Sequence, residues 1–378
     1  MPKLRFPGFT EDWEQRELSS LTEYIGTGKS RFVINEFGEY AILGSTNVIG
    51  YDDAYDYDGN FILTARVGAN AGQLYRYSGK VKITDNTVFI MSDSSQFIYY
   101  TLTHFDLRRL SFGTGQPLVK SSELQKLELC VPVSKSEQEK IGEIFNKIDN
   151  IITLHQRKLE HLNLKKKALL QKLFPKNGER YPELRFPGFT DAWEQCKLGD
   201  LAEIVRGASP RPISDPKWFD NDSNVGWLRI ADVTAQDGRI RYLEQKISEL
   251  GQEKTRVIKT PHLLLSIAAT VGKPVINYVP TGVHDGFLIF LNPKFNILYA
   301  FWWLEMFREK WNKYGQPGSQ VNLNSDLVKN QVINIPNEKE QEKISSFLES
   351  LDKIITLHQR KLEHLQLQKK ALLQQMFV

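Results

Sequence analysis

The sequence is poor in cysteine and contains no long apolar run. Only two of its 378 residues are cysteines, Cys130 and Cys196, which argues against a disulfide framework and a cysteine-rich zinc site. No uninterrupted apolar run reaches the roughly 18 residues of a membrane span. The first residues, MPKLRFPGF, contain no apolar core of a signal peptide. We therefore expect a cytoplasmic protein that has no membrane partner.

Charge of either sign is not in excess. Lys and Arg number 49 against 45 Asp and Glu, so the formal net charge is +4. This balance permits a polyanionic partner without requiring one, because a local patch matters more than the total. The hydrophobic and charged fractions, 41% and 25%, are those of an ordinary globular chain, and the length suggests two or three domains.

Motifs that carry catalysis are also missing. The segment from Glu23 to Ser30 ends like a phosphate-binding loop, but a glutamate replaces its first glycine. Residues 292–295 (NPKF) resemble the Asn-Pro-Pro-aromatic motif of amino-methyltransferases, but the second proline is absent and no glycine-rich cofactor loop precedes them. Neither HExxH nor GxSxG occurs. We therefore predict no catalytic residue, no metal site and no cofactor bound by this chain.

An internal repeat is the main feature that is present. Residues 3–18 (KLRFPGFTEDWEQREL) return at 183–198 as ELRFPGFTDAWEQCKL. Residues 137–174 match residues 340–377 at 26 of 38 positions, including the twelve-residue run IITLHQRKLEHL. The middles of the two halves differ, although a weak alignment places Asp85 on Asp285. Such a repeat predicts two domains of one fold with different surfaces.

Both repeated ends are predicted to be long helices. Ser134 and Asn337 each stand three residues before a glutamate, which is typical of a helix N-terminus, and Pro175 predicts that the first helix ends at Phe174. Apolar residues follow a heptad that is interrupted at equivalent places by His155 and Lys166, and by His358 and Lys369. We interpret these histidines as polar register devices. The residues predicted to pair the helices are Phe145, Ile148, Ile152, Leu159, Leu162, Leu169, Leu348, Leu351, Ile355, Leu362, Leu365 and Leu372.

Between the helices the sequence is mixed. Runs such as FILTARVG, KVKITDNTVFIM and LLLSIAATVG are typical of strands, whereas QFIYYTLTHFDLRRL and ILYAFWWLEMFREKW have helical spacing. We predict an α/β fold class: two similar domains, joined as a dumbbell by a long antiparallel two-helix coiled coil with a pseudo-twofold repeat. The predicted segments are a first domain at 1–135, the central repeated helix and linker at 136–180, a second domain at 181–336 and the C-terminal repeated helix at 337–378.

This layout resembles the specificity subunit of a type I restriction-modification system. The resemblance rests on LRFPGFT…WE before each domain, on GTGQ and GSQVNLNSDL late in each, and on P…EQEKI…IITLHQRKLEHL after each, and it covers the whole chain. It implies that each domain is a target-recognition domain that reads one half of a bipartite, asymmetric target in double-stranded DNA. It also implies that the helices set the spacer and dock two modification subunits.

The resemblance further implies which chemistry belongs to the partners. The modification subunits would carry S-adenosylmethionine-dependent adenine-N6 methylation, and a restriction subunit would cut DNA with ATP and Mg²⁺. This chain would then be no enzyme by itself. Two other classes stay open: a self-contained DNA-modifying enzyme, which would need a cofactor pocket and a catalytic motif, and a coiled-coil assembly scaffold with no DNA role, against which the unequal middles argue.

Candidate DNA-binding residues follow from their chemistry. Phosphates attract Lys, Arg and small donors, whereas guanine edges favour Arg or Lys and adenine edges favour Asn or Gln. Asp85 and Asp285 occupy matching places in the repeat, and the capping of a turn is an open alternative for either. In the first domain the polar, Gly- or Pro-flanked stretches offer Lys29, Arg31, Ser45, Asn47, Arg66, Asn70, Arg108, Arg109, Gln116 and Lys120. In the second domain they offer Arg206, Ser209, Arg211, Lys217, Trp218, Arg229, Thr270, Lys273, Gln320 and Asn322.

Overall fold

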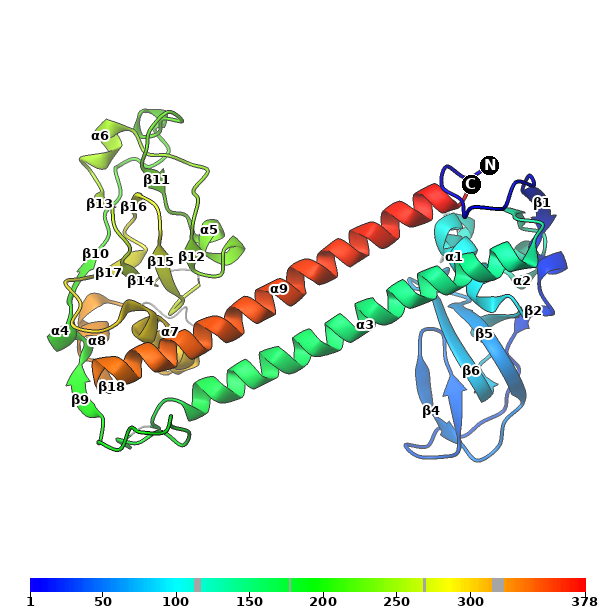
Figure 1. The fold of residues 1–378 in the computed structure, drawn as a ribbon, viewed down its shortest axis with the longest axis horizontal. Coiled ribbons are helices and arrows are strands. Elements are labelled where there is room, and N and C mark those ends of the chain that lie inside the picture. Colours follow the sequence, from blue (N-terminus) through cyan, green and yellow to red (C-terminus); the bar gives the residue numbers. More distant parts are fainter. Residues whose placement is uncertain (112–116, 177, 268–269, 315–322) are drawn as a thin grey trace. The chain divides into compact units, whose positions relative to one another are not determined.

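The computed structural model divides into two compact units. Unit 1 comprises Met1–Lys158 and His358–Val378, and unit 2 comprises Leu159–Leu357. Two long helices, α3 (Lys135–Lys172) and α9 (Glu338–Met376), each contribute to both units (Figure 1). The repeated segments are therefore helical, as predicted, although α3 ends two residues before Phe174. The domain boundaries drawn from the sequence stay a prediction. The structure describes residues 1–111, 117–176, 178–267, 270–314 and 323–378.

Unit 1 is built on a six-stranded sheet in the order β2-β7-β5-β6-β3-β4. Its neighbouring strands are antiparallel except β3 and β6, which run parallel, and β1 pairs separately with β8. Helix α1 lies against β5 and β6. The elements are β1 (Glu14–Glu17), β2 (Tyr24–Thr27), β3 (Tyr40–Leu43), β4 (Val48–Asp52), β5 (Tyr57–Ala65), β6 (Leu74–Ile83), β7 (Thr87–Met91), α1 (Ser95–Phe105), α2 (Ser121–Gln125) and β8 (Glu128–Val131).

Unit 2 has the same plan with an additional small sheet. Its main sheet has the order β10-β17-β14-β15-β12, a three-stranded sheet is formed by β11-β16-β13, and β18 pairs with β9. Helix α7 lies against β14 and β15. The elements are β9 (Glu194–Lys197), α4 (Leu198–Leu201), β10 (Glu203–Arg206), β11 (Gly226–Trp227), α5 (Ile230–Ala235), β12 (Arg239–Ile240), α6 (Glu249–Gln252), β13 (Arg256–Ile258), β14 (Leu263–Ser266), β15 (Pro274–Asn277), β16 (Thr281–Val283), β17 (Phe287–Leu291), α7 (Ile297–Phe307), α8 (Ser325–Lys329) and β18 (Val332–Ile335).

Each core combines the first turns of one long helix with the last residues of the other repeat. In unit 1, Phe145 of α3 lies 5.1 Å from the ring centre of Tyr100 and 5.7 Å from that of Phe377, just beyond α9. In unit 2, Leu348 of α9 shares a buried cluster with Phe174, which follows α3. The mixed α/β class predicted from the sequence is confirmed, and the last aromatic residue of each repeat is a core residue.

The repeated glutamates near the helix starts do not complete capping boxes. Asn337 accepts a hydrogen bond from the Glu340 amide at 3.0 Å, so this cap is as predicted. The Glu340 carboxylate, however, accepts two hydrogen bonds from Arg185, both at 2.8 Å. In unit 1 Arg5 donates to Glu137 in the same way, at 2.6 and 2.7 Å. Both glutamate side chains are 1% exposed, so these bidentate ion pairs explain why RFPGF and EQEK are repeated together.

The long helices pair head to tail within each unit. In unit 2, Leu159, Leu162 and Leu169 of α3 share an apolar cluster with Leu351 and Ile355 of α9. None of the twelve side chains predicted to pair the helices is exposed. Two of them, Phe145 and Leu348, belong to the domain cores described above rather than to the seam. None of the helices in the described part of the chain combines the length and apolarity that a membrane span needs.

The two lysines that interrupt the seam each form an ion pair with an aspartate of the facing helix. Lys166 of α3 lies 2.5 Å from Asp352 of α9, and Lys369 of α9 lies 2.6 Å from Asp149 of α3. These two ion pairs are equivalent in the repeat, and each lies inside one unit. The earlier residue of α3, Asp149, pairs with the later residue of α9, Lys369, so the two helices run in opposite directions.

The seam histidines also meet. In unit 1, Nδ1 of His155 lies 3.0 Å from Nδ1 of His358, its own equivalent in the repeat. A contact between equivalent residues marks the local twofold axis of a helix pair. The pairing thus requires one ring to donate and the other to accept, which fits the interpretation of these histidines as register devices.

Candidate nucleic-acid interface

Several loops that carry predicted DNA-binding residues meet at one edge of unit 1. The backbone amide of Arg66 and the hydroxyl of Ser45 both donate to the carbonyl of Asn86, at 2.9 and 3.2 Å. The Arg66 carbonyl accepts from the amide of Val119 at 2.8 Å, which brings the adjacent Lys120 to the same edge. Asn86, which lies beside Asp85 in the turn between β6 and β7, was not among the residues predicted from the sequence.

A glycine in each unit brings a further loop to this edge. The amide of Gly28 donates to the carbonyl of Thr87 at 3.0 Å, and the amide of Gly207 donates to that of Phe287 at 2.9 Å. A Cβ atom at Gly28 would overlap the carbonyl of Ile83, and one at Gly207 would overlap that of His284. Only glycine fits at either position. The residues that follow, beginning with Lys29 in unit 1 and Ala208 in unit 2, are thereby held at equivalent edges.

Most candidates in unit 1 are accessible. The side chain of Arg108 is 70% exposed and forms an ion pair with Asp106 at 2.8 Å. Ser45 is half-buried, and Gln116 lies outside the described residues. The exposed candidates are Lys29, Arg31, Asn47, Arg66, Asn70, Arg108, Arg109 and Lys120.

Asp285 is the centre of the corresponding edge of unit 2. Its two carboxylate oxygens accept hydrogen bonds from Ser209 at 2.8 Å and from Arg211 at 2.7 Å, and its carbonyl accepts from Arg206 at 2.6 Å. Partial burial disfavours the charged form of Asp285. The hydrogen bond from Ser209 and the nearby charges outweigh this effect and hold its pKa below the ordinary value. Asp285 is therefore a hub that contacts three predicted DNA-binding residues, Arg206, Ser209 and Arg211.

An arginine that the sequence did not single out supports the same edge. The side chain of Arg256 on β13 donates to the carbonyl of Arg206 at 2.8 Å. These residues are 50 positions apart in the chain, so no local pattern could have indicated the contact.

Other candidates in unit 2 are engaged within the fold. Lys273 is 8% exposed and forms ion pairs with Asp237 at 2.5 Å and Glu305 at 3.2 Å. Trp218 is 6% exposed, and its indole nitrogen donates to the carbonyl of Pro212 at 2.9 Å. Buried groups with internal partners are poorly placed to contact a ligand.

The remaining candidates of unit 2 vary in exposure. Arg229 is half-buried and forms an ion pair with Asp232 at 2.8 Å. Thr270 is also half-buried, whereas Lys217 is exposed. Gln320 and Asn322 lie outside the described residues.

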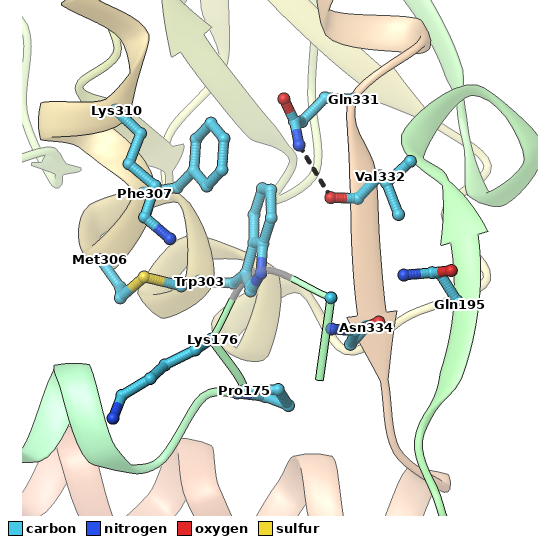
Figure 2. Close-up of a pocket in the computed structure, with 11 residues that line it drawn as sticks. Pro175, Lys176, Gln195, Trp303, Met306, Phe307, Lys310, Gln331, Val332 and Asn334 are labelled. Atoms are coloured by element: carbon cyan, nitrogen blue, oxygen red, sulfur yellow. Dashed lines mark hydrogen bonds between the residues drawn. The ribbon is translucent and has the colours of Figure 1, made fainter. Parts of the chain in front are cut away.

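A hollow of about 290 Å³ in unit 2 has none of the predicted DNA-binding residues among the described residues that line it (Figure 2). It is lined by Trp303 and Phe307, whose rings are stacked with centres 4.8 Å apart, and by Lys176 and Lys310. Among the described residues that line it, none is a carboxylate, a histidine or a cysteine. This lining offers no general acid or base at neutral pH. In the described part of the chain, no three His, Cys, Asp or Glu side chains gather as a metal site would require.

Comparison with known proteins gives a consistent result. A family model described as the type I restriction modification DNA specificity domain matches residues 10–164 and again residues 190–367. The type I restriction enzyme MjaVIII specificity subunit of Methanocaldococcus jannaschii is 24% identical over 409 residues, which cover 99% of this chain and 93% of that protein.

Two solved structures share the fold over nearly the full length. The S subunit of a type I restriction-modification system from M. genitalium has a TM-score of 0.69 at 15% identity, covering 100% of this chain and 99% of that one. A chain from a study of assembly and conformational transition in the type I R-M system has a TM-score of 0.56 at 14% identity, covering 97% and 96%. The two segments that match the family model together cover most of the chain, so the chain belongs to the type I restriction-modification DNA specificity family.

Proposed function

We propose that this DNA-recognition subunit of a type I restriction-modification complex reads a bipartite, asymmetric target, one half with each unit. The observation that carries the proposal is that the two units present equivalent edges with unlike side chains. The edge of unit 1 offers Lys29 and Arg66, whereas the edge of unit 2 offers Arg206 and Arg211 around Asp285. Identical edges related by a twofold axis would read a palindrome, and unlike edges would not.

We further propose that the paired helices set the gap between the half-sites. A helix of 38 residues, such as α3, is about 57 Å long, which exceeds the ~34–36 Å of one DNA turn. The ion pairs of Lys166 and Lys369 support this role, because they oppose sliding of one helix along the other. A fixed register gives a fixed unread spacer.

The partners proposed for the helix pair are two modification subunits. Leu154 and Leu164 of α3 are each 69% exposed, and their equivalents on α9, Leu357 and Leu367, are 68% and 67% exposed. Repeated apolar surface on a twofold pair fits two copies of one partner. We propose that S-adenosylmethionine binds those subunits, that ATP and Mg²⁺ serve a restriction subunit, and that this chain binds no cofactor and is not catalytic.

The test is selection from a randomised duplex pool with the chain in complex with its modification subunits. We expect two unlike half-sites at one fixed separation, and adenine methylation within them. A radiolabelled methyl donor supplied to the isolated chain should give no transfer. A palindromic or contiguous target would contradict the proposed division of reading, and transfer without partners would contradict the assignment of chemistry to other subunits.

A further inference from the structure

We infer that Asp285 is a positioning residue that holds Arg211 for recognition of a guanine in the half-site read by unit 2. The inference rests on the proposed function and names a specificity determinant within it. Asp285 accepts from Nη2 of Arg211 with one carboxylate oxygen and from Ser209 with the other. Both partners lie on the loop that follows β10, so one carboxylate fixes two points of that loop.

The carboxylate itself stands on a rigid support. The amide of Asp285 donates to the hydroxyl of Ser209 at 3.3 Å, and the amide of Gly286 donates to Nδ1 of His284 at 2.9 Å. The His284 ring lies 4.8 Å from the ring centre of Phe287 and 5.9 Å from that of Trp227. A side chain that is fixed by a well-ordered turn can itself fix the position of a second side chain.

Arg211 is bound by Asp285 and yet open to solvent. Its side chain is 74% exposed, and no second hydrogen-bond partner for its guanidinium occurs among the described residues. A guanidinium has five N–H donors, so the contact with Asp285 leaves donors for a ligand. An exposed ion pair contributes little to stability. Its effect here is to restrict the rotamers of a long side chain before binding, which lowers the entropy lost on binding.

The charge of Asp285 favours a base edge over a phosphate as the ligand of Arg211. A carboxylate that lies 2.7 Å from the guanidinium would repel a phosphate at the same position. The O6 and N7 atoms of guanine are neutral acceptors, and a paired N–H fork of arginine matches them. The arrangement therefore fits recognition of guanine in the major groove.

Unit 1 lacks this arrangement at the equivalent position. Asp85, which aligns with Asp285, is exposed, and among the described residues its carboxylate has no hydrogen-bond or ion-pair partner. Ser30 follows Gly28 by two residues, as Ser209 follows Gly207, but Ser30 accepts a hydrogen bond from the amide of Ile83 at 2.9 Å instead. Asp85→Asn is therefore a matched control that changes the same chemical group where no positioning role is expected.

The experiment measures half-site preference by duplex selection, using the full chain in complex with its modification subunits. Asp285→Asn is expected to lower the preference for guanine at one position of one half-site by about 3- to 10-fold, the value expected from releasing one ordered side chain. Arg211→Ala should relax the same position by about 5- to 150-fold. Arg211→Lys, which keeps the charge but not the fork, should also relax it. Asp85→Asn should leave both half-sites unchanged.

Each outcome is decisive for one claim. The inference is overturned if Asp285→Asn leaves the profile unchanged while Arg211→Ala alters it, or if Arg211→Lys retains the full preference, as a phosphate contact would. It is also overturned if Asp285→Asn weakens every position together with a fall in melting temperature, because that is a loss of fold. If the wild-type complex selects no bipartite sequence, the proposed function itself fails.

Discussion

Breaking the ion pair between Lys166 and Asp352 is expected to weaken the pairing of α3 and α9 in unit 2. The two side chains are 18% and 22% exposed, and Lys166 also lies 4.9 Å from the ring centre of Trp302. Exposed pairs contribute roughly 0.2–1 kcal/mol, whereas removing one partner of a buried pair costs roughly 3–5 kcal/mol. This pair lies between those limits, so Asp352→Asn should lower the free energy of unfolding by about 1–2 kcal/mol.

Urea unfolding followed by tryptophan fluorescence measures this effect. Trp13 is in unit 1 and the other six of the seven tryptophans are in unit 2, so the signal reports mainly on the unit that carries the pair. A double-mutant cycle with Lys166→Met should give a coupling of about 1 kcal/mol. The variant Glu309→Gln is a control in the same unit, because Glu309 and its partner Lys167 are 81% and 65% exposed; it should cost less than about 0.5 kcal/mol.

The equivalent pair provides an independent repetition of the measurement. Asp149 and Lys369 are 23% and 21% exposed, so Asp149→Asn should behave like Asp352→Asn, but in unit 1, where Trp13 is the fluorescent reporter. If both cycles show purely additive effects, the register of the helix pair described above is wrong.

Three further predictions concern the cores, the pH dependence and the spacer. Phe174→Ala and Phe377→Ala should each cost about 3–5 kcal/mol, measured by thermal melting, because these rings are 1% and 5% exposed in the cores of their units. Burial, which outweighs the attraction of Asp285, holds the pKa of His284 below its ordinary value, so the unfolded chain binds a proton that the folded unit does not. The free energy of unfolding therefore has its full value above about pH 6.5 and decreases as the pH falls. In urea melts of unit 2 at decreasing pH, His284→Gln should lose less of this free energy than the wild type. Insertion of one heptad at equivalent positions of both long helices lengthens the helix pair by about 10 Å. Duplex selection should then show an unread gap that is longer by about three base pairs, with both half-sites unaltered. A change in the half-sites themselves would refute the spacer role.

The helices were predictable from the sequence because their pattern is local and repeated. The heptad and the capping position of Asn337 are visible within a few turns. The partners of the polar seam residues were not predictable, since Lys166 meets Asp352 across 186 positions of the chain. In the same way, the repeated Glu340 looked like part of a capping box, but its carboxylate is taken by Arg185, which no local pattern could indicate.

The candidate interface was predictable only by residue type. Polar residues near glycines or prolines did lie on exposed loops, as Arg66 and Arg211 illustrate. The sequence could not show which of the others find partners inside the fold, and Lys273 is buried between two carboxylates. It also could not show the role of Asp285, because Ser209 and Arg211 reach this residue only through the pairing of β10 with β17. Tertiary partners therefore limit what a single sequence can show.

The central claim is that two unlike readers, held by one helix pair, define one split target. The most direct measurement is a genome-wide map of methylated adenines in cells that carry the gene and in cells from which it has been deleted. The account predicts one motif that disappears with the gene and consists of two different short words at a constant separation. A palindromic or uninterrupted motif, or an identical map in both strains, would contradict it.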